Sequence, residues 1–396
     1  MNYTRWTVVC LLASVPFAWY VLERRSTTPV VRFASFNAAL NRAEPGALLR
    51  ELRGGTSEQG RRIAEIVQRQ AVDVLLLCEL DRDAAAEAAM VFAREYLRVP
   101  QNGQLPIVFE FVFAPPVNTG EPSGLDLDDD GKVGGAADAF GYGAFPGQYG
   151  MALLSRHPIL LDQVRTFQTL SWAAMPGALR PAGVYTDAEW NALRLSSKTH
   201  IDVPIGIGER GRGGRVVHAL CSHPTPPVFD GPEDRNGCRN HDEIRFWVDY
   251  LTPARSGWIR DDAGKAGGLG DDEQFVVLGD LNCDPHDGDA RREALQQLLA
   301  HPRVFDPLPR SDGGELYAIR QLGANSGQRG DAACDTGDFP DEPGKGPGNL
   351  RIDYALPSRA FKVPRSGVYW PNPIRPEAKL CEASDHRLVF VDVALR

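Results

Sequence analysis

Residues 274–285 read QFVVLGDLNCDP. Within this stretch an apolar run from Phe275 to Leu278 passes through a glycine and ends in Asp280 and Asn282. A short run rich in valine and phenylalanine, bounded by Gly, Asp and Pro, is typical of a buried strand that leads into a polar loop. The stretch therefore predicts a strand whose end carries a carboxylate and an amide.

The same arrangement recurs along the chain. Other apolar runs end in Asn37, Glu79 and His223, and polar residues flank two more runs at Asp353 and at Asp385-His386. Taken singly, a carboxylate after a strand is ordinarily a turn residue or a helix cap. Because sites in α/β proteins form where strand ends meet, repeated endings of this kind indicate one shared crevice.

Strand-like and helix-like patterns alternate from residue 31 onward. Strands are predicted at 31–37, 72–79, 150–155, 216–222, 274–282, 351–356 and 388–394, and helices at 57–70, 82–96, 241–251 and 290–300, the last after Asp289 as N-cap. Three Gly/Pro/Asp-rich segments interrupt them, at about 98–149, 224–273 and 308–348. Strand patterns lie on both sides of each segment, so we expect one α/β domain over 31–396 with long loops. The pattern alone does not distinguish a sandwich of sheets from a doubly wound sheet.

The composition is that of a globular acidic protein. The chain has 396 residues, 43% hydrophobic and 24% charged, with a formal net charge of −9. This composition excludes a disordered tail, a coiled coil and a collagen-like fibre. Net negative charge, without a run rich in Lys, Arg and aromatic residues, argues against a strong binding surface for duplex DNA.

The first 30 residues have the pattern of a targeting segment. Residues 6–22 (WTVVCLLASVPFAWYVL) are uncharged and apolar, and a Ser/Thr/Pro-rich linker follows them. The run is long for a signal-peptide core and slightly shorter than the ~20 residues of a comfortable membrane span. We expect a signal peptide or membrane anchor over 1–30, hence export to a periplasmic, extracellular or membrane-anchored location; an ordinary buried helix is the alternative.

The cysteines outside the apolar run are even in number. Cys78 and Cys221 lie in strand-like runs and are expected in the core. The other four lie in polar sequence, which allows three pairings, and at least one disulfide is a candidate in an oxidising compartment. These four are Cys238, Cys283, Cys334 and Cys381. No CxxC motif is present, so a structural zinc site is not expected.

The polar residues at the strand ends are mostly oxygen donors. A cluster of carboxylates and amides, with little thiolate or imidazole, selects Mg²⁺ or Mn²⁺ over Zn²⁺ or copper. His223 and His386 add groups for proton transfer or for hydrogen bonds to an oxyanion. An oxygen-ligated divalent ion beside two histidines suits hydrolysis of a phosphate ester by an activated water.

Seven motifs in this order resemble the endonuclease/exonuclease/phosphatase superfamily, which includes deoxyribonucleases, sphingomyelinases and inositol polyphosphate 5-phosphatases. The motifs are SFN, LCELD, GMALLSRHPI, SHP, GDLNCDP, RIDY and SDHR. The resemblance covers about residues 31–396 and implies a four-layer α/β sandwich, in which helices flank two packed mixed sheets.

The resemblance also implies a part for each site residue, and no position departs from the family's pattern. Glu79 is then the principal metal ligand, Asn37 a ligand on the metal or phosphate side, and Asp385 a second acid on the metal side. Asp280 orients or activates the attacking water with Asn282 beside it, and Asp353 fixes the tautomer of His386, which contacts phosphate. His223 assists the leaving or attacking oxygen.

Two further groups are candidates for binding. Asp126, Asp128 and Asp130 match the first half of a calcium loop, but position twelve is Ala137 instead of the expected Glu, so a solvated acidic turn is the alternative. Arg194 and Lys198 are candidate phosphate contacts, with a solvated polar strand as the alternative.

The sequence thus predicts an exported Mg²⁺/Mn²⁺-dependent hydrolase of phosphate esters, with structural Ca²⁺ as an additional candidate. Its substrate is expected to be a small molecule, a lipid head group or a nucleic acid, and its oligomeric state is left open. A secreted DNA or RNA endonuclease and a calcium-stabilised, non-catalytic surface binding protein on the same fold are the alternatives.

Overall fold

The computed structural model describes residues 29–208, 214–342 and 344–395. The predicted targeting segment, including Cys10, lies outside this part of the chain except for its last two residues. Among the described residues, no helix is both long and apolar enough to cross a membrane.

Two large sheets form the centre of the molecule. The first has the strand order β12-β13-β1-β2-β4-β3 and the second β11-β8-β7-β6-β5. The strands of the first are β1 (Val30–Leu40), β2 (Val74–Leu80), β3 (Phe111–Phe113), β4 (Met151–Ser155), β12 (Lys362–Val368) and β13 (Val389–Ala394). Those of the second are β5 (Arg165–Thr166), β6 (Ile201–Ile207), β7 (Arg215–Cys221), β8 (Gln274–Asp280) and β11 (Asp353–Pro357). A small hairpin-like pair, β9 (Gly337–Asp338) and β10 (Asn349–Leu350), lies apart from both.

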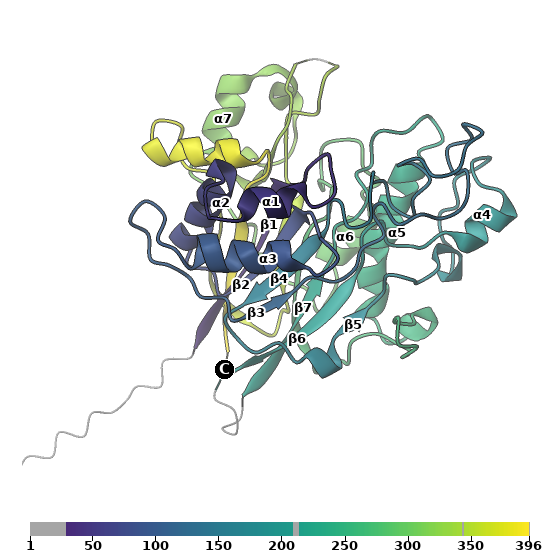
Figure 1. The fold of residues 1–396 in the computed structure, drawn as a ribbon, viewed down its shortest axis with the longest axis horizontal. Coiled ribbons are helices and arrows are strands. Elements are labelled where there is room, and N and C mark those ends of the chain that lie inside the picture. The colour runs from purple at the N-terminus through teal and green to yellow at the C-terminus, as the bar shows by residue number, and fades with distance from the viewer. Residues whose placement is uncertain (1–28, 209–213, 343, 396) are drawn as a thin grey trace, which may run out of the picture.

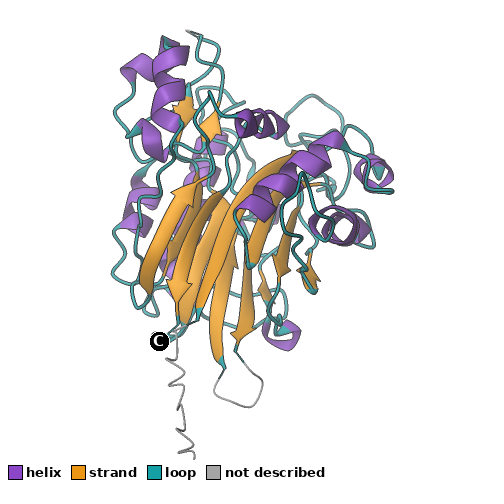
Figure 2. Cartoon of the chain, turned by 90° about the vertical axis from the view of Figure 1, so that its left-hand side faces the viewer, coloured by secondary structure: helices purple, strands orange, loops and turns teal. Residues whose placement is uncertain are grey.

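Both large sheets are mixed. β1 runs parallel to β2 and antiparallel to β13, while β7 runs parallel to β8 and antiparallel to β6. The two sheets pack face to face through contacts of β1 and β2 with β8, and of β1 and β13 with β11. Figure 2 shows their strands running side by side, with helices on both flanks.

Alternation along β8 shows how the layers are built. Val276 and Leu278 belong to the apolar core shared with the first sheet, whereas Phe275 and Val277 belong to the core under the outer helices. Successive side chains of a strand point to opposite faces, so a run that is apolar at every position is buried on both. This explains why the strand reads as an uninterrupted apolar run.

Helices cover the outer face of each sheet (Figure 1). Against the first sheet lie α1 (Ala47–Leu52), α2 (Glu58–Arg69) and α3 (Glu87–Phe92), and α3 continues into a π-helical turn over Ala93–Leu97. Against the second lie α5 (Arg235–Tyr250) and α6 (Glu293–Leu299). Two further helices, α4 (Asp187–Ala192) and α7 (Gly314–Gln321), lie in the long connections. The result is a four-layer α/β sandwich, so the predicted fold class is confirmed.

Three predicted helix starts were wrong. The helix expected at 82 begins at Glu87, because the Asp83 carboxylate accepts the amides of Ala85, Glu87 and Ala88 and forms a turn. Asp289 is not an N-cap, since α6 begins at Glu293 with Arg292 in the cap position.

The helix expected at His241 begins six residues earlier, inside a segment predicted as loop. Its first turns carry residues of low helix propensity such as Gly237, so no helical pattern is visible there. Asn240 secures this end of the helix by donating to the carbonyls of Thr225 and Leu281.

The six cysteines of the described residues are buried and none is paired. Cys78 and Cys221 lie in the core, as predicted. The candidate disulfide among the other four is absent. Cys238 and Cys283 pack in the core under the outer helices, whereas Cys381 packs in the core around the first sheet.

Candidate active site

Strand pairing gathers the predicted polar residues at one end of the two sheets. Asn37 on β1 pairs with Cys78 on β2, which puts Glu79 on the adjacent strand one residue further along. Across the sheet interface, Asp280 at the end of β8 pairs in register with Asp353 at the start of β11. The loops after β7 and before β13 add His223 and His386 at the same end.

Asp280 is the centre of this cluster. Its Oδ2 atom accepts a hydrogen bond from Asn37 Nδ2 at 3.0 Å and lies 3.4 Å from His223 Nε2 and 3.7 Å from His386 Nε2. All four side chains are at least nine-tenths buried. Groups in such a low-dielectric setting interact strongly, and each must be satisfied by a partner or a ligand.

A carboxylate and a hydroxyl orient His386. Its Nδ1 atom lies 2.9 Å from Asp353 Oδ2, and its backbone amide donates to Ser384 Oγ at 3.0 Å. Ser384 Oγ in turn donates to the carbonyl of Asn37 at 2.8 Å. A carboxylate on Nδ1 fixes the ring orientation and points Nε2 toward Asp280 and the open end of the site.

The environment separates the charge states of the two histidines. Burial alone would lower the pKa of His386, but the charges of Asp353 and Asp280 outweigh burial and raise it well above its ordinary value. At His223 burial is the largest effect, and the positive charges of Lys198 and His386 add to it, so its pKa is lowered well below the ordinary value. Burial also raises the pKa of Asp280, against the charge of His386. Opposed shifts among neighbouring groups are characteristic of acid–base sites.

Two residues of the site have strained backbones. Glu79 and Asn282 have φ values of 54° and 50°, in the left-handed region that costs non-glycine residues roughly 1–2 kcal/mol. Glu79 Oε2 accepts from Asn41 Nδ2 at 2.8 Å. Asn282 donates its backbone amide to Asp280 Oδ1 at 2.9 Å and its side-chain amide to the carbonyl of Pro224 at 3.1 Å. Strain of this kind concentrates where side chains must be aimed at a ligand.

The donor set suits a hard divalent cation. Carboxylate and amide oxygens from Glu79, Asn37 and Asp280 are the ligand type that Mg²⁺ and Mn²⁺ prefer. Burial raises the pKa of Glu79, opposed by the charge of His386, and a bound cation would relieve this desolvation. Ligand atoms of Asp280, Asp353 and His386 also lie within 4.8 Å of one another, which makes them a second candidate set. The raised pKa of His386 favours the imidazolium, which has no lone pair for a metal, and so favours the first set.

Asp385 is placed differently from the other predicted ligands. Its side chain is exposed, and its backbone oxygen accepts the amide of Asp338 at 2.8 Å. Its charge contributes to the raised pKa of His386, which is the next residue. The structure therefore puts Asp385 at the rim of the cluster.

Only one of the two predicted phosphate contacts lies at the cluster. Lys198 is buried there, and burial lowers its pKa against the charges of Glu243, Glu79 and Asp280. Arg194 is not brought to the cluster: its guanidinium donates to Asn118 Oδ1 at 2.7 Å and lies 3.9 Å from the centre of the Phe140 ring.

The acidic loop forms a compact turn. Ligand atoms of Asp126, Asp128 and Asp130 lie within 4.8 Å of one another. Backbone amides already use these carboxylates, because Asp126 accepts from the amides of Asp130 and Gly131. Calcium binding here stays a prediction.

Three residues near the cluster were not found from the sequence. Glu243 on α5 accepts from Ser197 N at 2.6 Å and from Thr225 N at 2.6 Å, and so connects the segments that carry Lys198 and His223. Asn41 orients Glu79, and Tyr149 lines the space beside it. Glu243 lies inside α5, where no strand end could point to it, whereas Asn41 follows β1 beyond Asn37, where the predicted strand ended, and Tyr149 lies just before β4.

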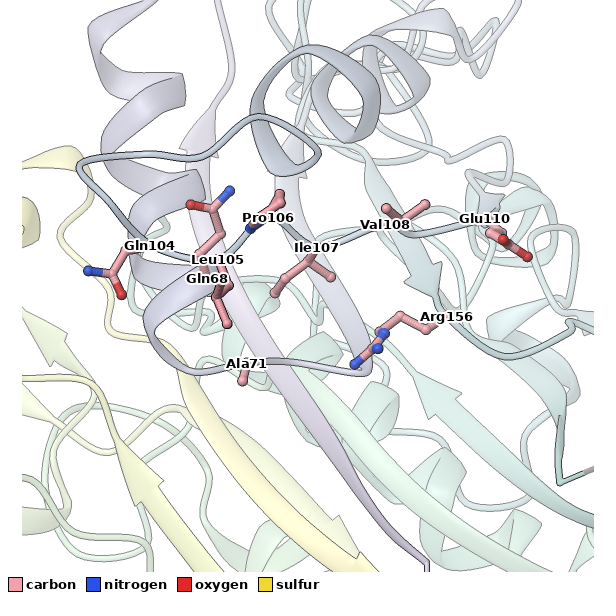
Figure 3. Close-up of a pocket in the computed structure, with 9 residues that line it drawn as sticks. All are labelled: Gln68, Ala71, Gln104, Leu105, Pro106, Ile107, Val108, Glu110 and Arg156. Carbon is pink, nitrogen blue, oxygen red and sulfur yellow. The ribbon is translucent and has the colours of Figure 1, made fainter.

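A surface pocket lies away from the cluster around Asp280 (Figure 3). Its volume is about 540 Å³, and Gln68, Leu105, Val108 and Arg156 are among the residues that line it. Arg156 follows β4 and pairs with Asp73, which precedes β2, so this surface pocket is at the opposite end of the strand from Glu79.

Comparison with known proteins identifies the family of the chain. The model of the Endonuclease/Exonuclease/phosphatase family matches residues 34–386. No curated protein sequence matches the chain.

Similar solved structures include a protein of this family from Beutenbergia cavernae, at 18% identity and a TM-score of 0.48, over 92% of this chain and 72% of that one. Sphingomyelinase C from Streptomyces griseocarneus has 16% identity and a TM-score of 0.45, over 92% and 99%. The mannosyl-6-phosphatase Bt3783 from Bacteroides thetaiotaomicron has 14% identity and a TM-score of 0.43, over 92% and 99%. Because the family model spans most of the chain, the protein belongs to the endonuclease/exonuclease/phosphatase family.

Proposed function

We propose that this protein hydrolyses phosphate esters with the help of a bound Mg²⁺ or Mn²⁺ ion. Members of the family are generally hydrolytic phosphoesterases. The observation that carries the proposal is Asp280, a buried carboxylate held between a neutral and a positively charged histidine. A site that only bound phosphate would have no need of a base at its centre.

Each residue has a part in this reaction. Asp280 orients a water molecule and takes its proton as the water oxygen attacks phosphorus. His386, kept as an imidazolium by Asp353, donates a hydrogen bond to a phosphoryl oxygen, and Lys198 supplies a second positive charge. The P–O ester bond breaks, and the proton on Asp280 leaves with the alcohol oxygen, so that water and ester give an alcohol and a phosphate.

Glu79 and Asn37 would hold the metal ion. The ion supplies charge neutralisation at the phosphoryl oxygens when it is bound. His223, with a lowered pKa, stays neutral; its Nε2 lies 3.4 Å from Asp280 Oδ2, and its buried Nδ1 has no partner among the described atoms. This arrangement keeps the Asp280 carboxylate aimed at the water.

The test is turnover of bis-p-nitrophenyl phosphate and p-nitrophenyl phosphate. We expect EDTA to abolish it and added Mg²⁺ or Mn²⁺ to restore it, and we expect Glu79→Gln and Asp280→Asn to lower kcat by about 10²–10⁴-fold. Asp187→Asn, which changes an exposed carboxylate on α4, is the matched control and should keep full activity. Turnover that survives both EDTA and the two site substitutions would show that the site is wrongly assigned. Phosphate binding without turnover would favour the non-catalytic binding protein.

Export is part of the proposal. It is supported by the apolar run at residues 6–22, followed by a polar linker. Fractionation of cells that express the full chain should find it outside the cytoplasm, and removal of residues 1–28 should retain it inside.

A further inference from the structure

A cavity of about 650 Å³ opens from the catalytic cluster. Glu79 and Lys198 lie at its catalytic end, and Tyr149, Tyr185, Leu193 and Phe229 are among its walls. The walls come from two of the three long loop segments and from the connection before β6. A cavity of this volume is of the size that binds small organic ligands.

Strained backbone holds one of these walls in place. Tyr149 has a φ of 53°, which is unusual for a bulky residue, and its amide donates to Asp81 Oδ1 at 3.0 Å. Two residues earlier the chain must be glycine, because a Cβ at Gly147 would lie 2.2 Å from the carbonyl oxygen of Arg82. The backbone of Tyr149 is thereby held in place, and its side chain lines the same cavity as Glu79.

Other groups of the protein already engage the two arginines of the cavity. Arg239 donates to the backbone carbonyls of Phe140, Arg194, Leu195 and Ser196. Arg235 lies 3.9 Å from the carboxylate of Glu233. Beyond the catalytic end, the cavity therefore offers tyrosine, phenylalanine and aliphatic surface more than charge to a ligand.

The mouth of the cavity carries exposed aromatic rings. Phe229 is 88% exposed, with a φ of 67°, and Tyr142 is 67% exposed. An exposed phenylalanine in a strained backbone gains nothing from folding, since its ring remains in water. Stacking on a ligand would bury it.

We propose that this cavity binds the organic group of the substrate ester, and that this group is an uncharged aromatic or apolar ring. The inference rests on the proposed function and names its substrate class: small aryl or apolar phosphate esters, as opposed to sugar phosphates or polynucleotides. The ester phosphate would lie at Glu79 and Lys198 while the ring lies against Tyr149, Leu193 and Phe229.

Binding of phosphonates tests the inference without turnover, because their P–C bond is not hydrolysed. The wild-type protein in Mg²⁺ buffer is titrated calorimetrically with methylphosphonate, phenylphosphonate and 4-carboxyphenylphosphonate. We expect phenylphosphonate to bind at least tenfold more tightly than methylphosphonate, as burial of a ring predicts. The charged ring should bind more weakly than phenyl. Equal affinity for methyl and phenyl, or a preference for the charged ring, would overturn the proposal.

A pair of variants locates the selectivity. Phe229→Ala should lower the phenyl-to-methyl affinity ratio at least threefold. Leu105→Ala removes a similarly exposed side chain, 83% accessible, at the surface pocket of Figure 3 and should leave both affinities unchanged. An unchanged ratio in Phe229→Ala would exclude this cavity as the ring site. Turnover without ring selectivity contradicts this inference alone, whereas ring-selective binding without turnover contradicts the proposed function alone.

Discussion

Glu243 connects the segment that carries Lys198 to the segment that carries His223. Its Oε1 accepts from the backbone and the hydroxyl of Ser197, and its Oε2 accepts from the amide of Thr225. Its charge also opposes the desolvation of Lys198. It is 1% exposed, on the helix that covers the second sheet, so it acts through other residues as a positioning residue.

Substitution of Glu243 should affect both geometry and charge. Glu243→Gln leaves one of the three donors without an acceptor, at a cost of about 1–3 kcal/mol in the free energy of unfolding. We expect kcat/KM to fall about tenfold or more, because a small displacement of a catalytic group has large effects. The alkaline limb of the pH–rate profile should move to lower pH, since the Lys198 ammonium loses a stabilising negative charge.

A matched substitution separates positioning from stability. Asp249 is a buried carboxylate on the same helix, paired with Arg255 at 2.5 Å and Trp258 at 3.1 Å. Asp249→Asn should lower Tm without moving the alkaline limb. If the alkaline limb of the pH–rate profile does not move in Glu243→Gln, Glu243 has a structural role only.

At the scale of elements, the end of β8 lies unusually close to the end of β7. A Cβ at Gly279 would be 2.2 Å from the carbonyl oxygen of Ser222. The residues that follow Gly279 and Ser222 are Asp280 and His223, whose side chains lie 3.4 Å apart. The glycine therefore sets the spacing of two site residues through the backbone.

Gly279→Ala should force the two strand ends apart. We expect a loss of roughly 1–3 kcal/mol in the free energy of unfolding and a fall in kcat larger than the loss of folded protein. The measurements are urea unfolding and initial rates. Gly257→Ala is the control, because nothing lies within 4 Å of its Cβ position and no strain is involved. Equal rates for the two variants would contradict this account of the spacing.

Strands that consist of an uninterrupted apolar run could be predicted from the sequence, because that signal is contained in the run itself. The apolar runs at β1, β2, β4, β7, β8, β11 and β13 were predicted as strands, with shifts of a few residues at their ends. β6 and β12 were missed because Pro204 and Gly206 interrupt the first, and β12 is half exposed with charged residues. Both are defined by pairing with the strands next to them in the chain, β6 with β5 and β7 and β12 with β13, which a single run does not record.

At the scale of the whole molecule, one buried carboxylate has no part in the proposed reaction but affects stability. Asp335 is 4% exposed, and its Oδ2 has no partner among the described atoms. Burial, then the charges of Asp284 and Asp287, raise its pKa to about 8. In the unfolded chain this pKa is about 4. The contribution of Asp335 to stability is therefore full below about pH 4 and is lost as the pH rises through about 8.

Asp335→Asn should remove this pH dependence. We expect the variant to be more stable than wild type at pH 8–9, by on the order of a few kcal/mol, and close to wild type near pH 4. Asp331→Asn should instead be less stable than wild type by a similar amount at every pH from 5 to 9, because the hydrogen bond from Arg310 lowers the pKa of Asp331 and this contribution is lost only as the pH falls below about 4. Tm measured from pH 4 to 9 checks both, and a parallel pH profile for wild type and Asp335→Asn would contradict the assignment.

The site was predictable to the extent that its residues end strands. Asn37, Glu79, His223, Asp280, Asn282, Asp353 and His386 all follow or precede an apolar run, and the structure brings them together at one end of the sheets. Asn41 directly follows β1 and Tyr149 lies just before β4, but neither was singled out. Glu243 could not be found in this way, because long-range packing alone gives it its place. The walls of the cavity have the same origin.

The order of strands in the first sheet has a consequence for synthesis of the protein. β1 lies between β2 and β13, and the amide of Leu395 donates to the carbonyl of Pro29, so the beginning and end of the described chain are neighbours. In a nascent chain emerging from the ribosome, one edge of β1 is open until β13 appears, and His386 emerges shortly before that strand. Closure of such a distant pair is slow. The cluster around Asp280 therefore cannot assemble until residue 386 has been synthesised.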